Sequence, residues 1–246
     1  MLGAKKPSFV AVFSCLDHGV GMRTTIYVDG FNLYFGCLKR SDDKWLDLRA
    51  LLFDAIVIPQ HPHATLTQIK FFTADIKTKF ASRGNVARNA QQRYHQALAL
   101  QLGDQLEIVN GYYSPRKSRS LVYRNPPNKD ERVETWQLEE KQTDVNIAIS
   151  GYRDAAKALA DQVVFVSNDS DLEPALQAIH EDFGDRLTIG LIIPIRDSVA
   201  VKPGAALARW AHWTRHYIRD DEFTACHLPR VFQRTGKKPV LKPDYW

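Results

Sequence analysis

The chain has 246 residues, of which 44% are hydrophobic and 25% charged. These proportions argue against a disordered, collagen-like or coiled-coil protein, and no apolar run approaches the roughly 18 residues that a membrane span needs. The net charge of +5 favours an anionic partner, and three widely spaced cysteines predict neither a disulfide framework nor a zinc site, as expected for a cytoplasmic protein.

Residues 1–21 are expected to be a non-native or upstream-start extension. Two lysines precede the apolar run PSFVAVFSC, as in a secretory signal, but the run is short and Asp17 and His18 follow it directly. Met22 stands immediately before a strong strand pattern. We therefore expect one domain over residues 22–229, followed by a basic tail over residues 230–246.

From residue 22 onward, segments with strand patterns alternate with segments of helical periodicity. Strands are expected at 24–29, 66–74, 106–113, 163–167 and 187–193. Helices are expected at 31–39, 46–58, 86–102, 145–159 and 171–180, with Gly103 ending the third and Pro174 in the first turn of the fifth. This alternation predicts an α/β fold with a central, mostly parallel sheet that is covered on both faces.

Two segments depart from this alternation. Residues 114–141 form a long polar insertion, in which LVYR and RVETWQL are expected to pair as a hairpin around NPPNKDE, with a solvated loop as the alternative. The tail carries Arg234, Lys237, Lys238 and Lys242 and is expected to be a flexible phosphate-binding arm or a disordered end.

Four aspartates are expected to meet at the carboxyl edge of the sheet. Asp29 ends the first strand, Asp169 and Asp171 follow the fourth, and Asp144 opens the helix before it. Because ligands of such sheets bind where the strand order reverses, these carboxylates converge if the first and fourth strands are neighbours. An all-carboxylate cluster favours Mg²⁺ or Mn²⁺. Each residue also has a structural alternative, since Asp and Asn are common in turns and as helix caps.

Three segments then indicate a known family. YVDGFNLYF (27–35), EKQTDVNIAI (140–149) and VSNDSDLEPAL (166–176) resemble the NYN domain, a branch of the PIN-like nucleases, over residues 24–229. The resemblance implies a three-layer α/β/α PIN-like fold and metal-dependent cleavage of RNA. By position, Asp29, Asp144, Asp169 and Asp171 form the metal and catalytic site, with Asn32, Ser167 and Asn168 beside it.

These inferences predict a metal-dependent ribonuclease, an endonuclease by preference, in which bound metal activates water and neutralises the phosphate. The alternative is a non-catalytic or regulatory nucleic-acid-binding module. An aspartyl-phosphate phosphatase is disfavoured because Phe31 stands where its second aspartate is expected.

Basic residues are expected to surround the acidic edge and to contact RNA. The loop after the second strand carries Lys77, Lys79 and Arg83, and the segment after the third carries Arg116, Lys117 and Arg119. A polyanion crossing the site suits this arrangement, whereas simple solvation of these side chains is the alternative.

Overall fold

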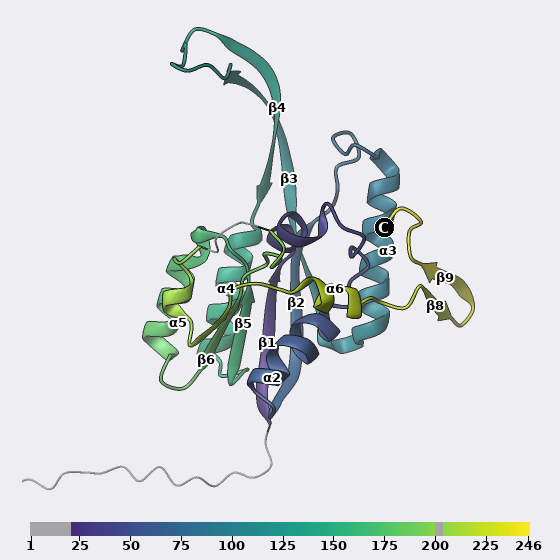
Figure 1. Ribbon diagram of the computed structural model, residues 1–246, viewed down its shortest axis with the longest axis vertical. Helices are drawn as coiled ribbons and strands as arrows, with labels where there is room; N and C mark the ends of the chain where they lie inside the picture. Colours follow the sequence, from purple (N-terminus) through teal and green to yellow (C-terminus); the bar gives the residue numbers. More distant parts are fainter. Residues whose placement is uncertain (1–20, 200–203) are drawn as a thin grey trace, which may run out of the picture.

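The computed structural model describes residues 21–199 and 204–246 and contains a seven-stranded sheet in the order β4-β3-β2-β1-β5-β6-β7 (Figure 1). The expected extension over residues 1–21 lies outside the described residues, apart from Gly21, and stays a prediction. Every neighbouring pair is parallel except β3 with β4. The strands are β1 (Met22–Asp29), β2 (Ala64–Ala74), β3 (Leu106–Leu121), β4 (Arg132–Lys141), β5 (Gln162–Val166), β6 (Thr188–Ile192) and β7 (Trp213–Arg215).

The predicted α/β class with a mostly parallel sheet is confirmed. β1 pairs with β2 on one side and with β5 on the other, so the strand order reverses between β1 and β5. This is the expected neighbour relation between the first and fourth predicted strands. It brings the residues that follow β1 and β5 to one edge of the sheet.

Helices pack against both faces of the sheet (Figure 1). On β1, Ile26 and Val28 belong to a hydrophobic cluster with η2 and α3, whereas Tyr27 belongs to a second cluster with α4 and α5. This alternation follows from the two-residue period of a strand. The helices are α1 (Gly30–Leu33), the π-helices η1 (Tyr34–Leu38) and η2 (Arg49–Val57), α2 (Ile58–Gln60), α3 (Gly84–Leu102), the 3₁₀ turns η3 (Gly103–Gln105), η4 (Ser170–Leu172) and η5 (Ala208–Trp210), α4 (Thr143–Ala156), α5 (Glu173–Phe183) and α6 (Asp220–Ala225).

The helix α4 buries Ile147, Gly151 and Ala155 rather than the stripe that its sequence suggests. Its large apolar residues Val145 and Ile149 are 59% and 51% exposed, although their spacing suggests a buried stripe. Gly151 instead packs so closely that a Cβ there would lie 2.7 Å from the Phe165 ring. Hydrophobic periodicity therefore identifies this helix correctly but indicates the wrong buried face.

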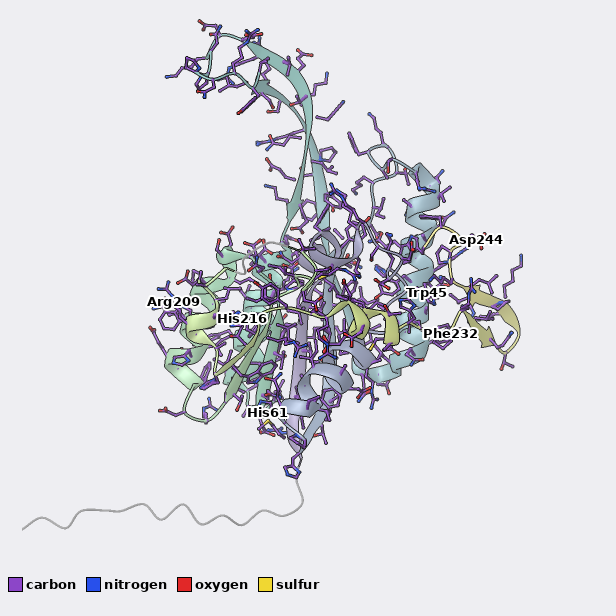
Figure 2. All side chains as sticks on the ribbon, viewed as in Figure 1. Trp45, His61, Arg209, His216, Phe232 and Asp244 are labelled. Atoms are coloured by element: carbon purple, nitrogen blue, oxygen red, sulfur yellow. The ribbon has the colours of Figure 1, made fainter. Side chains whose placement is uncertain are left out.

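Strands β3 and β4 form an arm that extends away from the rest of the molecule (Figure 1). A hairpin is confirmed, but its first strand is not the predicted LVYR: β3 continues without a break from the sheet, residues 112–121 pair with β4, and Leu121 opposite Arg132 is the one LVYR residue in the strand. Side chains project from the arm into open space (Figure 2), and Tyr123 at its tip is 95% exposed.

The segment expected to be a flexible or disordered end forms a hairpin of β8 (Val231–Arg234) and β9 (Lys237–Leu241). Val240 is buried in the cluster that contains α3, and Trp246 packs against the same cluster. Among the described residues, no helix is both long and apolar enough to cross a membrane.

Candidate functional site

The four predicted aspartates lie at the expected edge of the sheet. Asp29 ends β1, Asp169 and Asp171 begin the turn after β5, and Asp144 lies in the first turn of α4. Burial, together with the charges of Asp29, Asp169, Glu140 and Asp171, raises the pKa of Asp144 to about 6. The structure therefore brings these carboxylates within electrostatic reach of one another.

The carboxylate of Asp29 serves as the N-cap of α1. Its Oδ1 accepts hydrogen bonds from the backbone N–H groups of Phe31 (3.0 Å) and Asn32 (2.9 Å). Its Oδ2 accepts from the Asn32 side chain (2.7 Å) and from the Ser167 hydroxyl (2.9 Å). Asp29 is only 1% exposed, and burial raises its pKa while these hydrogen bonds lower it. Both oxygens of this carboxylate thus have local structural partners.

The predicted residues after β5 are joined by a chain of local hydrogen bonds. Asp169 caps η4 by accepting from the backbone N–H of Asp171 (3.0 Å), and its own N–H donates to Ser167 (3.1 Å). The backbone N–H of Asn168 donates to Asn32 Oδ1 (3.2 Å), which ties the turns after β1 and β5 together. These contacts are those expected if Asp169 caps a turn, which is the structural alternative to a metal ligand. Within the described ranges, no three His, Cys, Asp or Glu residues are arranged to hold a metal ion.

The predicted basic residues do not gather around the acids. Arg116, Lys117 and Arg119 lie on the arm, where Arg116 is paired with Glu139 and Gln137. Lys79 lies 5.0 Å from the ring of Trp136 in the middle of β4, and the Arg83 guanidinium lies 4.6 Å from the Tyr245 ring. Lys77 is exposed. Binding of RNA by these residues stays a prediction.

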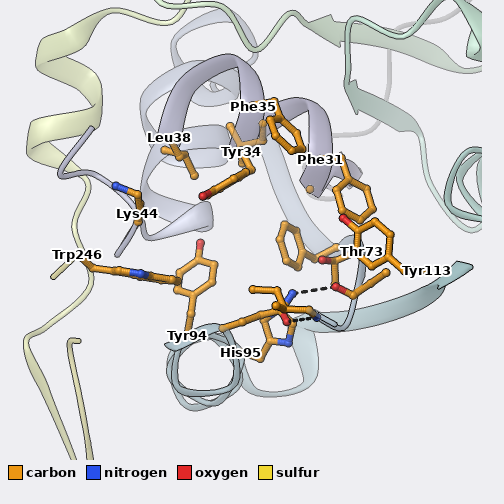
Figure 3. A pocket seen from close by; sticks show the side chains of 16 residues that line it. Phe31, Tyr34, Phe35, Leu38, Lys44, Thr73, Tyr94, His95, Tyr113 and Trp246 are labelled. Carbon is orange, nitrogen blue, oxygen red and sulfur yellow. Dashed lines mark hydrogen bonds between the residues drawn. The ribbon is translucent and has the colours of Figure 1, made fainter. Parts of the chain in front are cut away.

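Next to the acidic edge lies an open cavity of about 160 Å³ with aromatic walls (Figure 3). The cavity lies between the turn after β1, the π-helix η1, the end of β2 and the first half of α3. Its aromatic lining consists of Phe31, Tyr34, Phe35, Phe71, Tyr94, Tyr113 and Trp246.

Close packing of the turn after β1 shapes this cavity. A Cβ at Gly30 would lie 2.6 Å from the carbonyl oxygen of Phe72, so only glycine allows the turn to approach β2 so closely. Phe31 then meets Tyr113 edge to face, with 5.6 Å between the ring centroids. The π-helix η1 follows at once and supplies Tyr34, a placement typical of π-helical turns near functional sites.

Polar groups at the base of the cavity are positioned by specific contacts. The Gln91 side chain accepts from the backbone N–H of Ile76 (3.0 Å) and donates to the carbonyl oxygen of Ala74 (2.9 Å), as the dashed lines in Figure 3 show. Burial lowers the pKa of His95, which favours its neutral ring, and burial raises the pKa of Tyr113 to about 12. The cavity thus presents a neutral imidazole and a protonated phenol to a ligand.

Sequence reasoning missed this cavity. Its lining comes from five separated parts of the chain, and no motif connects them. The one local signal is the aromatic run at 31–35, in which three of five residues are aromatic and which was interpreted only as a helix beside the acids.

Comparisons with known proteins give the class of the chain. No family model matches it. A solved structure of a protein of unknown function from Vibrio parahaemolyticus has a TM-score of 0.51 at 15% identity, with 87% of this chain and all of the other covered, which supports the fold alone. A monooxygenase from Pseudomonas putida (strain DSM 28022 / S16) is 36% identical over 245 residues, covering 92% of this chain and 75% of the relative.

This relationship places the chain in an oxidoreductase family. The relative is the 6-hydroxy-3-succinoylpyridine 3-monooxygenase HspA, and the chain belongs to its family.

Four predictions are therefore wrong. The extensive identity to a monooxygenase contradicts the metal-dependent ribonuclease, its classification as an endonuclease and hydrolase, and the nucleic-acid-binding module offered as its alternative. The same relationship, together with the lack of a metal-binding group in the described residues, contradicts Mg²⁺ or Mn²⁺ as the cofactor. The physical reason for the metal error is that Asp29 and Asp169 have the spacing of metal ligands but cap the turns after β1 and β5.

Proposed function

We propose that the chain is a monooxygenase that oxidises a small hydroxylated nitrogen heterocycle, and that this ring binds in the aromatic cavity. The observation that carries the proposal is the 36% identity to a 6-hydroxy-3-succinoylpyridine 3-monooxygenase over 92% of the chain. The cavity provides independent physical support, because it matches a ring of this kind in size and chemistry.

The volume of the cavity suits one six-membered ring. At about 160 Å³ it is close to the ~150 Å³ of an apolar protein cavity that is known to accept benzene. Aromatic walls favour offset or edge-to-face contacts with a flat ligand, as the existing pair of Phe31 and Tyr113 illustrates.

The polar groups of the cavity are suited to orient a hydroxypyridine. Such a ring offers a nitrogen and an oxygen, which need donors or acceptors in a buried site. The phenol of Tyr113 is a donor at neutral pH, since its pKa is about 12, and the neutral ring of His95 has one donor and one acceptor nitrogen. These two side chains hold the ring in one orientation rather than merely enclosing it.

Oxygenation also requires electrons. One atom of O₂ enters the product and the other leaves as water, which consumes two electrons, supplied by a reduced nicotinamide or flavin, and two protons. The turn after β1 does not fit the pyrophosphate of a dinucleotide, because a buried carboxylate, Asp29, caps it where such sites have a glycine-rich loop. We therefore assign only ring binding and orientation to the described residues.

The finer description of the fold as a three-layer α/β/α, PIN-like domain is part of our proposal. It is supported by the two hydrophobic clusters, to which alternate residues of β1 contribute. We also propose that this domain spans residues 22–229 and that the protein is cytoplasmic. The buried free thiols of Cys37 and Cys226 suit that location.

Isotope labelling tests the proposed function. The full chain is incubated with 6-hydroxy-3-succinoylpyridine under ¹⁸O₂, with reduced nicotinamide or reduced flavin supplied separately, and products are analysed by mass spectrometry. We expect one ¹⁸O atom in the product with at least one donor, and a greatly reduced yield from Tyr113→Ala. Absence of an oxygenated product with every donor, or oxygen derived from water, contradicts the proposal.

A further inference from the structure

The opening of the aromatic cavity brings together basic residues from separate parts of the chain. Lys44, from the segment after η1, lines the cavity itself. Arg83, from the residue before α3, lies with its guanidinium 4.6 Å from the Tyr245 ring. Tyr245 directly precedes Trp246, which also lines the cavity, and Lys242 stands three residues earlier.

These cations are close enough to affect one another. Burial lowers the pKa of Lys44, the charges of Lys242 and Arg83 lower it further, and Asp42 and Asp43 oppose this effect. The carboxylate of Asp43 is already bound by Arg196 and by His227, the latter at 2.8 Å. No Asp or Glu is among the residues that line the cavity in the described ranges. Among the described residues that line the cavity, Lys44 is therefore a cation and none is a carboxylate, although Asp42 and Asp244 stand close to these cations along the chain.

Trp246, at the end of the segment 242–246, lines one wall of the cavity. The Trp246 ring meets Tyr94 edge to face at a centroid distance of 5.7 Å and Trp45 at 6.4 Å. The segment is held in place by the Tyr245 hydroxyl, which donates to the carbonyl oxygen of Val86 (3.1 Å). Figure 3 shows Lys44 and Trp246 on the same side of the cavity, opposite Tyr113.

We propose that this cavity selects aromatic rings that carry a carboxylate, with the ring held by Tyr113 as above, its carboxylate-bearing side towards Trp246, and the carboxylate bound by Lys44. This inference rests on the proposed function, in which the cavity holds the aromatic substrate. The Lys44 ammonium donates to the carbonyl oxygen of Ser41, and because it has three donors, it can keep that contact and still bind an anion. Arg83 and Lys242 strengthen the attraction without needing direct contact.

A pair of ligands isolates the carboxylate. The probes are 6-hydroxy-3-succinoylpyridine, whose succinoyl group ends in a carboxylate, and its neutral methyl ester; the dissociation constants are measured by titration calorimetry without turnover. We expect the full chain to bind the acid about tenfold more tightly than the ester, as one partly exposed charge-assisted hydrogen bond implies. Lys44→Met, which keeps the aliphatic stem, should abolish this preference, whereas Lys157→Met, an exposed change after α4, should preserve it.

Trp246→Ala distinguishes the contribution of the aromatic wall to binding from that of the charge of Lys44. It should weaken acid and ester alike, and so leave their ratio unchanged. Equal affinities of acid and ester for the unaltered chain, equal losses for both in Lys44→Met, or no binding of either ligand would overturn the inference. Selective binding of the acid without any oxygenation would instead count against the proposed function alone.

Discussion

The acidic edge and the aromatic cavity are neighbours at the carboxyl ends of the strands. They differ in that the side chains of the edge are engaged by the surrounding turns, whereas those of the cavity face a volume that a ligand can occupy. At the acidic edge, Asp29 is 1% exposed and both its oxygens accept hydrogen bonds from the turns around it. In the cavity, aromatic rings line an open volume of about 160 Å³. Only the turn at Gly30 and Phe31 separates the two regions.

This contrast shows that a conspicuous pattern of residue types does not by itself identify a functional site. The carboxylates hold the turns after β1 and β5 in place, and those turns then position the cavity. Asn32 illustrates the coupling, because it donates to Asp29 and accepts from the backbone of Asn168. We therefore expect changes at the acidic edge to alter stability and changes at the cavity to alter ligand binding.

The largest expected effect is on stability, from Asp29→Ala. This change leaves two backbone N–H groups, the Asn32 amide and the Ser167 hydroxyl without their acceptor in a buried site. We expect a loss of about 3 kcal/mol in the free energy of unfolding, or roughly 6–12 °C in melting temperature. Calorimetry measures the loss, with the exposed Asp130→Ala at the arm as control; a decrease below ~1 kcal/mol would contradict the capping role.

The next effect is on binding, from Phe31→Ala. Phe31 lines the cavity and contacts Tyr113 edge to face, but it belongs to neither buried hydrophobic cluster. We expect roughly tenfold weaker binding of 6-hydroxy-3-succinoylpyridine, equivalent to about 1.4 kcal/mol, with little change in melting temperature. Unchanged affinity in titration calorimetry would place the ligand elsewhere.

A smaller effect depends on pH, in Asp144→Asn. The pKa of Asp144 in the folded chain, about 6, lies above its ordinary value of 3.8, so the native state holds this proton more tightly. The resulting stabilisation is complete below the unfolded pKa and is lost as the pH rises through about 6. The variant should therefore melt about 2–4 °C higher near pH 8, ~1 kcal/mol after allowance for solvent exposure, and equally near pH 3.5. A difference that grows towards low pH would contradict this assignment.

The smallest expected effect is that of divalent cations. Because Asp29 and Asp169 use their oxygens as caps, millimolar Mn²⁺ or Mg²⁺ should shift the melting temperature by less than about 1 °C relative to EDTA. A cation that binds only the folded chain at a hundred times its Kd stabilises it by about 2.7 kcal/mol, which is easily detected. A shift of that size that is abolished in Asp169→Asn would contradict this prediction and support a metal site at the acidic edge.

Much of the fold was predictable because it depends on local patterns. The five predicted strands and the neighbour relation of β1 and β5 are confirmed, since continuous apolar runs determine buried parallel strands. The buried face of α4 was not predictable in this way, because Gly151 packs closely against Phe165 while larger apolar residues remain exposed.

The candidate site was less accessible from the sequence. The acids were placed at the correct edge, but their spacing is the same whether they bind a metal or cap a turn. The cavity is formed by contacts between distant residues, such as Trp246 against Tyr94 and Trp45, and no spacing rule connects these positions. The interpretation of residues 230–246 as a flexible or disordered end failed for the same reason.

The central claim is that the aromatic ligand binds in the cavity and not at the acidic edge. Titration of 6-hydroxy-3-succinoylpyridine into the unaltered chain, Tyr113→Ala and Asp169→Asn tests it most directly, because Tyr113 lines the cavity and Asp169 lies at the edge. We predict that Asp169→Asn binds like the unaltered chain and that Tyr113→Ala binds at least tenfold more weakly. The reverse pattern, with affinity lost in Asp169→Asn and retained in Tyr113→Ala, would contradict the account.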